Sequence, residues 1–410
     1  MQWRTGVQVL SPFQDEFTDV VLNYSARNNH NEQRGLPMSE FLGDQDVAQR
    51  VLEHISHNTT DSGEAVWRES VENYRSGERF ETELQQVLRR YPTPFCPSAA
   101  VANPGDYVAR SAAGVPLLVV RGDDGVVRGF RNACRHRGAQ VAEGQGCARA
   151  FRCLYHGWTY RLSGELQHVP HEEGFPGLDK DQHGLAPVNV VEKAGMIFVT
   201  QDEPGIAADL DALPEFFTSK QQIFDSGDYS LDVNWKVFLE TFLEGYHIKP
   251  AHKETFYPFG YDNLNIVESV GRNSRITFPF QRIESLRDVA PEQRQVEGLL
   301  TYVYHLFPNV VIAVLTHHTT MLVLEPEAVD RTRVFGYSLT NRKLDGEEAL
   351  EKARIDADFV RTTGQTEDIA LAKSIQASLH SGANKEFTFG RYEKLIVDFH
   401  SNMKDLLSSA

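Results

Sequence analysis

The sequence is poor in the features that would tie it to a membrane, to nucleic acid or to an oxidising compartment. Its 410 residues include only four cysteines, too few for a disulfide framework and typical of a reducing cytoplasm. No run of about 18 apolar residues is present, which argues against a membrane span, and the first residues lack the apolar core of a signal peptide. The net charge of −16 argues against nucleic acid and anionic membranes as partners.

Nucleotide-binding loops are missing as well. We find neither a Gly-x-Gly-x-x-Gly turn nor a P-loop, so the chain offers no evident site for a flavin or a nicotinamide. Any redox chemistry would therefore need electrons from another protein. Internal repeats and low-complexity segments are also absent. With 41% apolar and 24% charged residues, the composition is that of an ordinary globular protein with room for two domains.

What the sequence does contain is a pair of metal-ligand motifs. Cys134-x-His136 is followed, sixteen residues later, by Cys153-x-x-His156. Two thiolates and two imidazoles in this order are the ligand set of a Rieske [2Fe–2S] centre, in which histidines hold one of the two irons. A structural zinc site is the alternative, but zinc motifs usually place two or more residues between paired ligands, so the Cys-x-His half favours iron–sulfur. Cys147, between the motifs, is expected to be a small packed residue rather than a fifth ligand.

A second group of possible ligands lies further along the chain. His247 and His252 have a spacing that suits a non-haem Fe(II) site, which uses two His and one carboxylate. Five residues turn a straight helix by about 140°, so the two rings cannot share one of its faces. We expect Pro250 to end the helix and let His252 return from the following turn. Two neighbouring histidines are weak evidence alone, but behind an electron relay they gain weight because the relay needs an acceptor.

The segments around both motifs resemble those of one family, the oxygenase α subunits of Rieske non-haem iron, aromatic-ring-hydroxylating systems. The resemblance covers roughly residues 70–400. It rests on Cys-Arg-His-Arg-Gly at 134–138, Cys-Leu-Tyr-His-Gly-Trp at 153–158, Trp235-Lys236, and Glu244-x-x-His247-x4-His252.

The resemblance implies roles for these residues. The two Cys and two His of the first motif would hold the cluster, and His247 and His252 would be two ligands of the iron. Glu244 would hydrogen-bond a ligand histidine and a cluster histidine of the neighbouring subunit. The family most often has Asp at this position, and Glu resembles a subgroup that includes oxygenases of carnitine, choline and glycine betaine. That subgroup often has Cys where this chain has Gly245.

The third iron ligand should be a carboxylate from a distant segment. Residues 366–376 resemble the family's late helix, where an Asp precedes a Gln on a buried face, and Asp368 stands at that position. An acid among apolar residues needs a partner, and iron is a suitable one. Complementing the N-terminal dipole of the helix is the alternative role for Asp368. Its expected apolar face contains Leu371 or Ala372, Ile375 and Leu379. Weaker ligand candidates are Glu367, Asp356 and Asp358.

Two further groups could line a substrate pocket. His317 and His318 alternate on a predicted strand, so that one of them can face the pocket. A set of aromatic residues could form a cage for a quaternary ammonium group. This set is Phe256, Tyr257, Phe259, Tyr261, Phe278 and Phe280. The plainer alternatives are ordinary strand histidines and ordinary core aromatics.

The patterns predict an α+β protein, with an all-β Rieske [2Fe–2S] domain and a helix-grip catalytic domain whose twisted antiparallel sheet holds helices on one side. Two apolar runs at 115–120 and 126–130 flank an Asp-Asp-Gly turn and predict a hairpin. Helices are expected at 45–60, 64–91, 233–249, 346–362 and 366–380, and strands at 188–191, 196–200, 264–281 and 299–341. We divide the chain into an N-terminal arm with helices (1–92, of which 1–44 is an extended or loosely ordered arm), the Rieske domain (93–183) and the catalytic domain (184–410).

The resemblance implies a terminal oxygenase. It would use dioxygen and electrons from a separate NAD(P)H-dependent reductase or ferredoxin to hydroxylate, dihydroxylate or oxidatively dealkylate a small organic substrate of the aromatic acid or quaternary amine type. The cofactors would be a Rieske [2Fe–2S] cluster and mononuclear Fe(II), in a cytoplasmic homotrimer that pairs each cluster with the iron of the adjacent subunit. Two other classes stay open: a Rieske electron carrier without oxygenase activity, and a helix-grip ligand-binding module.

Overall fold

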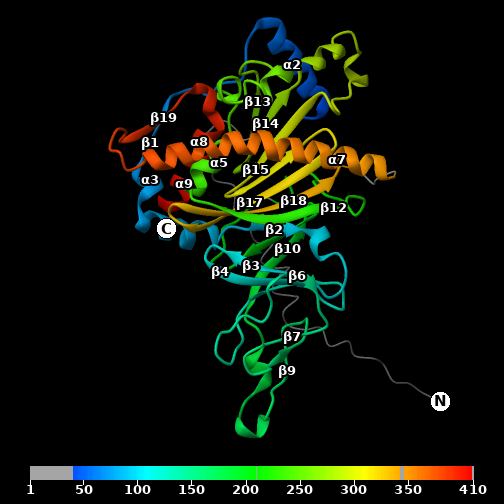
Figure 1. The fold of residues 1–410 in the computed structure, drawn as a ribbon, viewed down its shortest axis with the longest axis vertical. Helices are drawn as coiled ribbons and strands as arrows, with labels where there is room; N and C mark the ends of the chain where they lie inside the picture. The colour runs from blue at the N-terminus through cyan, green and yellow to red at the C-terminus, as the bar shows by residue number, and fades with distance from the viewer. Residues whose placement is uncertain (1–39, 209, 342–345, 409–410) are drawn as a thin grey trace, which may run out of the picture. The chain divides into compact units, whose positions relative to one another are not determined.

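The computed structural model describes residues 40–208, 210–341 and 346–408, so that the arm expected at 1–44 lies almost wholly outside the described residues. The described chain forms two seven-stranded antiparallel sheets and two smaller ones. Helices cover one face of the second large sheet (Figure 1). No helix in these ranges is long and apolar enough to cross a membrane. The predicted α+β class is confirmed.

The first large sheet combines two separate stretches of chain. The hairpin predicted at 115–130 is confirmed, with Leu117 paired to Arg131 and Arg121 to Val127. Two later strands, β10 and β11, pair with β5 and β2, so this sheet extends past the boundary that we placed between residues 183 and 184. Its strands, in order across the sheet, are β2 (Thr93–Pro97), β11 (Met196–Thr200), β10 (Pro187–Lys193), β5 (Val127–Arg131), β4 (Val115–Arg121), β3 (Asp106–Ala112) and β6 (Gly144–Cys147).

A three-stranded sheet lies beyond the first sheet, on the side away from the catalytic half (Figure 1). It consists of β7 (Phe151–Arg152), β8 (Thr159–Tyr160) and β9 (Leu166–His168). A separate apolar core that includes Trp158 and Tyr160 surrounds Cys134 and Cys153. The first metal-ligand motif is therefore built on its own small core.

The second large sheet is the frame of the catalytic half. Side chains alternate across it, so that Met321 and Val323 of β17 face the first sheet while Leu322 and Leu324 face the helices. Its strands, in order, are β12 (Ile223–Leu231), β18 (Arg331–Thr340), β17 (His318–Ala328), β16 (Val310–Val314), β15 (Leu300–Leu306), β14 (Asn273–Pro279) and β13 (Ile266–Val270).

One buried arginine links the two large sheets. Arg110 of β3 lies 3.9 Å from the ring centroid of Phe95 in β2 and 4.6 Å from that of Phe335 in β18. Its Nη1 is 3.8 Å from a carboxylate oxygen of Glu325 in β17. Burial raises the pKa of Glu325 to about 7, although the charge of Arg110 acts in the opposite direction. The junction between the sheets therefore holds a titratable group with almost no access to water.

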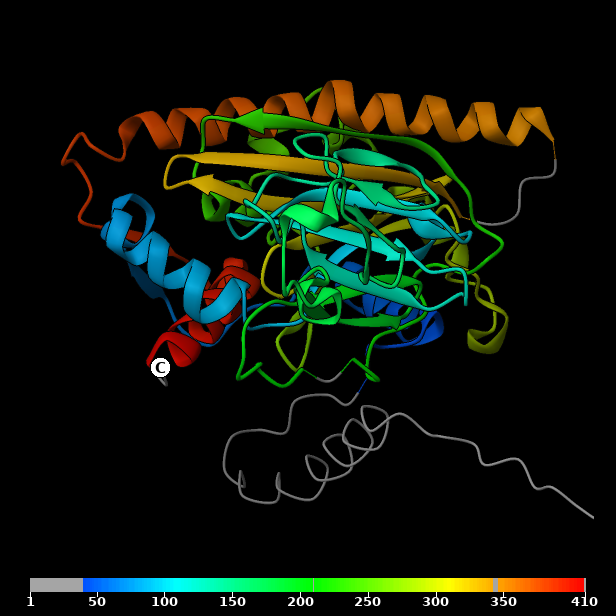
Figure 2. The same cartoon turned by 90° about the horizontal axis from the view of Figure 1, so that it is seen from below.

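A long helical stretch crosses the helix face of the catalytic sheet, as Figures 1 and 2 show from two sides. It begins as α7 (Glu347–Phe359), passes through a π-helical turn, η8 (Val360–Gly364), and continues as α8 (Gln365–Ser378). The two helices expected at 346–362 and 366–380 are thus one rod with a π turn between them. Such turns insert about one extra residue into an α-helix and are frequent at functional sites.

The long helix predicted near 233–249 is wrong. The chain forms α5 (Trp235–Glu240), then turns, and forms one further turn of helix as α6 (Ile248–Ala251). The carboxylate of Glu244 accepts the backbone N–H groups of Tyr246 and His247, which a continuous helix would have used in its own ladder. The segment 64–91 is also not helical throughout, because β1 (Trp67–Ser70) pairs with β19 (Glu386–Phe389) first.

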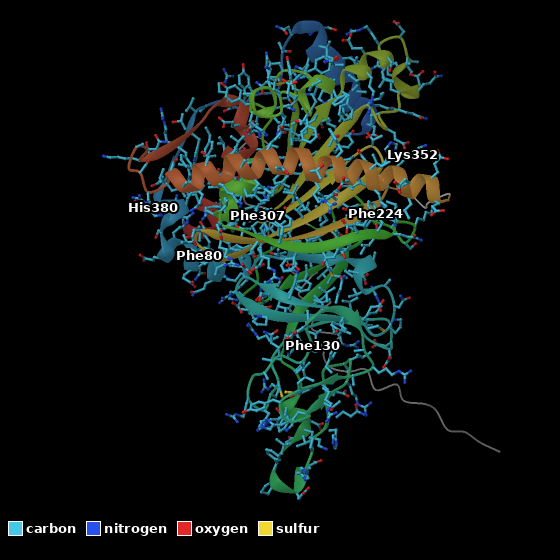
Figure 3. All side chains as sticks on the ribbon, in the orientation of Figure 1. Phe80, Phe130, Phe224, Phe307, Lys352 and His380 are labelled. Carbon is cyan, nitrogen blue, oxygen red and sulfur yellow. The ribbon has the colours of Figure 1, made fainter. Side chains whose placement is uncertain are left out.

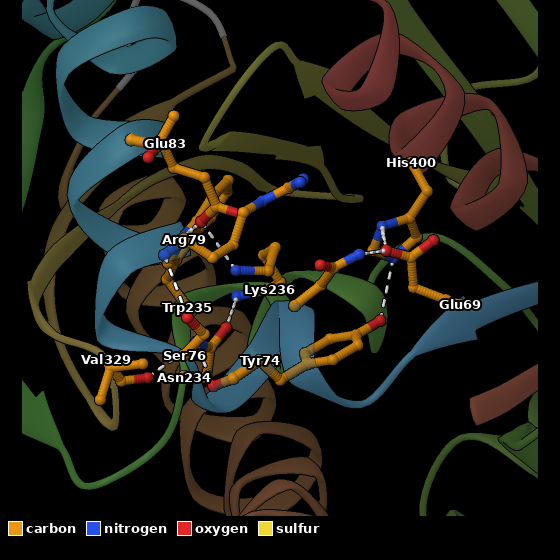
Figure 4. A network of polar contacts seen from close by, with 12 residues as sticks. Glu69, Tyr74, Ser76, Arg79, Glu83, Asn234, Trp235, Lys236, Val329 and His400 are labelled. Atoms are coloured by element: carbon orange, nitrogen blue, oxygen red, sulfur yellow. Dashed lines mark hydrogen bonds and ion pairs between the residues drawn. The ribbon is translucent and has the colours of Figure 1, made fainter. Parts of the chain in front are cut away.

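A buried polar network fixes where α5 begins (Figure 4). Asn234 caps the helix by accepting the N–H of Lys236 at 3.0 Å, and its amide donates to two backbone carbonyls. Lys236 is 1% exposed, and its ammonium group lies 2.8 Å from the carboxylate of Glu83. A buried charge without its partner is costly, so this pair holds the start of α5 in one position. The position of α5 in turn determines where the site residues that follow it in the chain lie.

The remaining helical elements pack around these sheets. They are α2 (Asp44–His57), α3 (Glu72–Arg75), α4 (Gly77–Glu83), the π turn η1 (Leu84–Leu88), α9 (Lys394–Ser408), and the short 3-10 turns η2 (Ser98–Val101), η3 (Glu172–Gly174), η4 (Lys180–His183), η5 (Tyr257–Phe259), η6 (Gln281–Leu286), η7 (Pro291–Gln293) and η9 (Arg391–Glu393). The helix expected at 45–60 is confirmed as α2.

Candidate metal centres

His247, His252 and Asp368 come together from two segments that are far apart in the sequence. One ligand atom of each lies within 4.8 Å of the others. Asp368 Oδ1 is 3.0 Å from Nε2 of His252 and 3.5 Å from Nε2 of His247. This oxygen is buried and accepts no hydrogen bond. Buried polar atoms are rarely left unpaired, and a cation between the three side chains would satisfy this one. Two imidazoles and a carboxylate are the donor set of a non-haem Fe(II) site, so these residues fit that metal.

Glu244 holds the outer nitrogen of His247. Its carboxylate accepts a hydrogen bond from Nδ1 of His247 and the backbone N–H groups of Tyr246 and His247, the last at 3.0 Å. The side chain of Glu244 is 11% exposed, so Glu244 is not a solvated helix carboxylate. With Nδ1 engaged, the Nε2 atom of His247 is directed toward Asp368.

His252 has an equivalent partner whose role the sequence analysis missed. Glu367 accepts a hydrogen bond from Nδ1 of His252 at 2.7 Å and another from the hydroxyl of Thr255 at 2.7 Å. We had considered Glu367 only as a weaker ligand candidate. Consecutive acids at the start of α8 thus contact both nitrogens of one imidazole, Glu367 at Nδ1 and Asp368 at Nε2. The sequence signal that could have indicated this role is the pair of consecutive acids formed by Glu367 and the predicted ligand Asp368.

The carboxylates around the two imidazoles change their pKa values. Burial disfavours charge on His247, but the nearby carboxylates of Asp368 and Glu244 outweigh burial and raise the pKa of His247 to about 10. The pKa of His252 is also raised, with burial opposed by Asp368 and Glu367. The pKa of Asp368 is lowered, because the two imidazoles outweigh its burial. The electrostatics of this site therefore favour a positive charge at its centre.

Two expectations about this region need correction. Pro250 does not end a helix but is the third residue of α6, in a first turn whose N–H groups have no partners in the helix anyway. The two rings meet because α6 is a single turn, with His247 just before it and His252 just after. On α8, Leu371 and Ile375 are 44% and 40% exposed. The buried face of α8 that includes Asp368 is instead completed by Ala372 and Leu379.

The four residues of the first motif lie on two loops of the same construction. In each loop the cysteine N–H donates to the carbonyl five residues later, and the cysteine carbonyl accepts the N–H of a glycine four residues later. The pairs are Cys134 with Ala139 and Gly138, and Cys153 with Trp158 and Gly157, with N···O distances of 2.8 to 2.9 Å. Both glycines have positive φ, 82° and 75°, which turns each loop back at little steric cost.

These loops bury the thiols and leave the imidazoles nearer the surface. Cys134 and Cys153 are 3% and 2% exposed, whereas His136 is half-buried and His156 is exposed. The two imidazole centroids are 4.6 Å apart. The Tyr160 hydroxyl lies 3.2 Å from Cys134 Sγ. Burial raises the pKa of the Cys134 thiol, so it needs a bound metal to be a thiolate at neutral pH.

Across the part of the chain that the structure describes, the only trio of ligand atoms gathered within 4.8 Å is that of His247, His252 and Asp368. The choice between a cluster and a single zinc ion at the first motif therefore rests on the order and spacing of its Cys and His residues, which favour a Rieske cluster.

Other candidates lie elsewhere. Cys147 is exposed on β6 and is not packed inside the cluster loop as expected. His318 is fully buried while His317 is exposed. The six aromatic residues proposed as a cage have separate surroundings: Phe256 packs on His252 and Phe359, Tyr257 lies under Lys249, Phe280 lies under Arg282, Phe259 is 55% exposed, and Tyr261 and Phe278 belong to different cores.

Comparisons with known proteins agree with this arrangement. The model of the Rieske [2Fe-2S] domain matches residues 92–191, and that of the ring hydroxylating alpha subunit (catalytic domain) matches residues 222–409. The carnitine monooxygenase oxygenase subunit of Escherichia coli (strain K12) is 28% identical over 349 residues, covering 80% of this chain and 88% of that protein. Choline monooxygenase, chloroplastic, of Spinacia oleracea is 26% identical, covering 76% and 71%.

Solved structures share the fold. The quaternary ammonium Rieske monooxygenase CntA in complex with L-carnitine superposes with a TM-score of 0.70 at 21% identity, over 90% of this chain and 99% of that one. Naphthalene 1,2-dioxygenase from Rhodococcus sp. gives a TM-score of 0.70 at 20% identity, with the same coverage. Both domain models match in the expected order, and each covers one of the two candidate metal centres. The chain therefore belongs to the family of Rieske non-haem iron oxygenase α subunits, whose cofactors are a Rieske [2Fe–2S] cluster and a mononuclear iron.

Proposed function

We propose that this oxygenase oxidises a small quaternary amine at an iron held by His247, His252 and Asp368. The observation that carries the proposal is the buried, unpaired oxygen of Asp368, directed at two imidazole nitrogens whose opposite sides are held by Glu244 and Glu367. The substrate class is supported by relatives named for carnitine and choline. An aromatic substrate is the second candidate, supported by the name of the catalytic-domain model.

The side chains do the positioning in this proposal. When bound, the cluster supplies single electrons and the iron supplies the centre at which dioxygen is reduced. Glu244 and Glu367 fix the orientation and the tautomer of His247 and His252, so that both Nε2 lone pairs are directed at one point. Asp368 brings the negative charge that a divalent cation needs in a buried site. Cys134, His136, Cys153 and His156 would hold the cluster on their paired loops.

We infer that Glu244 connects the iron centre of one chain with the cluster of another. The cluster tip exposes apolar surface beside His156, with Leu154 96% and Tyr155 57% exposed. Tyr246, two residues after Glu244 in the turn, is 59% exposed. Exposed apolar side chains of this kind mark contact surfaces. A CntA structure is described as giving insight into inter-subunit electron transfer. The assembly that we propose is a homotrimer, with a mass in light scattering three times the 46.3 kDa of one chain.

The electron donor would be a separate NAD(P)H-dependent reductase or ferredoxin. No nucleotide-binding loop was found in the sequence, and five arginines gather near the cluster motifs of an otherwise acidic chain: Arg131, Arg135, Arg137, Arg149 and Arg152. Opposite charges on the two proteins would speed their encounter. A cytoplasmic location belongs to the same proposal, and the four cysteines, all free in the structure, are compatible with it.

Metal analysis separates the proposed oxygenase from the two other classes. The oxygenase predicts about three iron and two acid-labile sulfide per chain, an electron carrier two and two, and a ligand-binding module none. The function itself is tested by oxygen and NADH consumption with a compatible reductase and three quaternary amines: carnitine, choline and glycine betaine. An oxygenase with full metal content that consumes oxygen only with benzoate-type acids would refute the proposed substrate class.

A further inference from the structure

The helix face of the catalytic sheet is not uniformly packed. Ala313, Thr320 and Ser338 are paired neighbours on three central strands and point toward the helices, yet all three are only half-buried. Their neighbours on the opposite face, such as Met321 and Tyr337, are 0% and 5% exposed. Central strands beneath a helix keep solvent access only where the helix stands off from the sheet. The half-burial of these three small side chains indicates such a space between this part of the sheet and α7, which packs on β17 and β18.

A buried histidine closes one end of this space. His318, the first residue of β17, precedes Thr320 on the same face of the strand and is 0% exposed. Its Nδ1 atom is 3.0 Å from Oδ2 of Asp356 on α7, while its Nε2 atom is buried and has no hydrogen-bond partner. The ring of Phe224 on β12, labelled in Figure 3, lies 6.2 Å from the imidazole. A polar nitrogen in this position costs free energy unless something binds to it.

The π turn aligns this end of the space with the iron site. Asp356 and Asp368 are twelve residues apart on the α7–α8 rod. In a regular α-helix twelve residues would place them about 120° apart around the axis. The one-residue insertion of a π turn reduces the difference to about 20°, so both acids face the sheet, about 18 Å apart along the rod. Asp368, an iron ligand, and Asp356, the partner of His318, therefore lie at the two ends of the same face of the rod.

Asp356 also determines what the free nitrogen can do. It accepts the backbone N–H of His317 at 3.1 Å as well as the bond from His318. Burial raises the pKa of Asp356, but His318 and His317 outweigh this and lower it overall, so the carboxylate is ionised and accepts. The ring proton of His318 is then on Nδ1, which leaves Nε2 with a lone pair directed at a ligand that donates a hydrogen bond.

We propose that His318, oriented by Asp356, is a specificity-determining residue that accepts a hydrogen bond from a substrate hydroxyl at the end remote from the iron. The inference rests on the proposed function and adds to it a second requirement: the substrate carries a donor at its far end. A buried site built to pair with a hydroxyl discriminates strongly against the analogue that lacks it, because its own polar atom is then left unpaired.

The test is calorimetric binding to the oxidised holoenzyme, which needs no turnover. The probes share one skeleton and differ at one group: choline has a hydroxyl, O-methylcholine only accepts, and ethyltrimethylammonium does neither. Wild-type protein should bind choline about tenfold or more tightly than either analogue. His318→Leu should remove this preference while the cluster spectrum stays intact. Equal affinities for all three probes in wild type would overturn the proposal.

A second variant, Asp356→Asn, tests whether Asp356 sets the donor and acceptor roles of the imidazole. An Asn amide at this position donates to Nδ1, which moves the ring proton to Nε2 and turns that atom into a donor. Preference should then shift from choline to O-methylcholine. Asp358→Asn is the matched control, because Asp358 is on the same helix, is exposed and pairs with Arg361. This control should keep the wild-type order, and a loss of preference in it equal to that in Asp356→Asn would count against the assignment.

A ligand-free crystal structure of the holoenzyme tests the role of His318 independently of the proposed substrate class. Nε2 of His318 is buried and unpaired, and buried polar atoms in crystals are usually paired with protein or with water, so an ordered water bonded to this atom is expected where a ligand can later take its place. If Nε2 of His318 is packed against protein with no water bonded to it, its proposed role as a hydroxyl anchor, the acceptor for a substrate hydroxyl, is refuted whatever the substrate is. If instead the water is present and no quaternary amine binds, the proposed substrate class fails, and the anchor is supported and tested further with benzyl alcohol, benzyl methyl ether and toluene.

Discussion

Single residues around the iron site divide into those that would touch the metal and those that hold the ligands. Glu244 and Glu367 each engage the Nδ1 atom of one imidazole, but only Glu244 lies two residues before an exposed tyrosine in the turn after α5. Two chemically identical side chains therefore lead to different expectations on substitution.

Glu244→Gln should leave both metals loaded and slow product formation in a single turnover of pre-reduced enzyme by a large factor. Gln keeps the size and one acceptor but loses the charge that orients and polarises His247. Glu244→Ala should be at least as damaging, because it leaves a buried imidazole N–H unpaired. Wild-type single-turnover rates in both variants would contradict the bridging role of Glu244.

Glu367→Gln should chiefly weaken iron retention, by about 10- to 100-fold, because the carboxylate that aligns His252 is lost. The measurement is iron content after dialysis against a chelator, with the cluster spectrum as the check on folding. Glu254→Gln is the control, since the Glu254 side chain is 84% exposed and pairs with the neighbouring Lys253. Iron retention equal to that of the control would show that Glu367 does not support His252.

Cys153→Ser should abolish the visible and EPR spectrum of the cluster, because the thiolate is one of its two cysteine ligands.

His247→Ala should keep that spectrum and stop substrate oxidation, since the two centres are built from separate segments. A full cluster signal in the first variant, or normal turnover in the second, would remove the corresponding assignment.

The candidate ligands could be named from the sequence because their chemistry demands particular residue types at short spacings, as in Cys134-x-His136 and Glu244-x-x-His247. Asp368 needed the family resemblance as well, because nothing local identifies a ligand over a hundred residues away. The role of Glu367 was missed for a physical reason. Whether an acid binds a metal or a histidine behind it depends on a rotation of about 100° between neighbouring helix positions.

At the level of elements, the turn between α5 and α6 is the part that the sequence predicted least well. The hairpin at 115–130 has alternating apolar strands and a Gly turn, which are local signals. The break after Glu240 has no such signal, because it depends on Glu244 capping the backbone N–H groups of the turn and on the contact of Gly245 with Asn265, the residue before β13. One of these contacts can be tested directly.

Gly245 packs against Asn265 of the neighbouring segment. A Cβ at Gly245 would stand 2.1 Å from Asn265 Oδ1, which is too close for any real contact. Gly245→Ala should therefore destabilise the protein by about 1–3 kcal/mol. Gly245→Ala combined with Asn265→Ala should cost less than the sum of the two single changes, because the clash is gone. Denaturant unfolding of all four proteins measures this coupling, and simple additivity would show that the two positions do not interact.

For the whole molecule, the junction between the two large sheets is expected to respond to pH. Folding raises the pKa of Glu325 from 4.5 to about 7, so the folded state favours the protonated form. Its contribution to stability is complete below pH 4.5 and is lost as pH rises to 7, by up to about 3 kcal/mol. In Glu325→Gln this titration is absent.

Unfolding midpoints at several pH values test this. The stability of wild type relative to Glu325→Gln should fall between pH 4.5 and 7 and stay level above pH 7. Glu327→Gln is the control, because Glu327 is on the same strand, partly exposed and paired with Arg331. A constant difference between wild type and Glu325→Gln across this range would mean that Glu325 is ionised in the folded protein throughout.

The π turn at Val360–Gly364 has a consequence for how relatives of this protein can diverge. Loss of one residue from this turn would leave Asp356 and Asp368 eleven positions apart in a regular α-helix, an angle of about 20°, so both acids would still face the sheet. A substitution that straightens the turn at constant length would instead rotate Asp356 by about 100° relative to Asp368 and part it from His318, while every iron ligand stayed in place. Related chains can therefore lose this one residue without disturbing either acid, whereas changes that remove the π turn without a deletion separate His318 from its carboxylate partner.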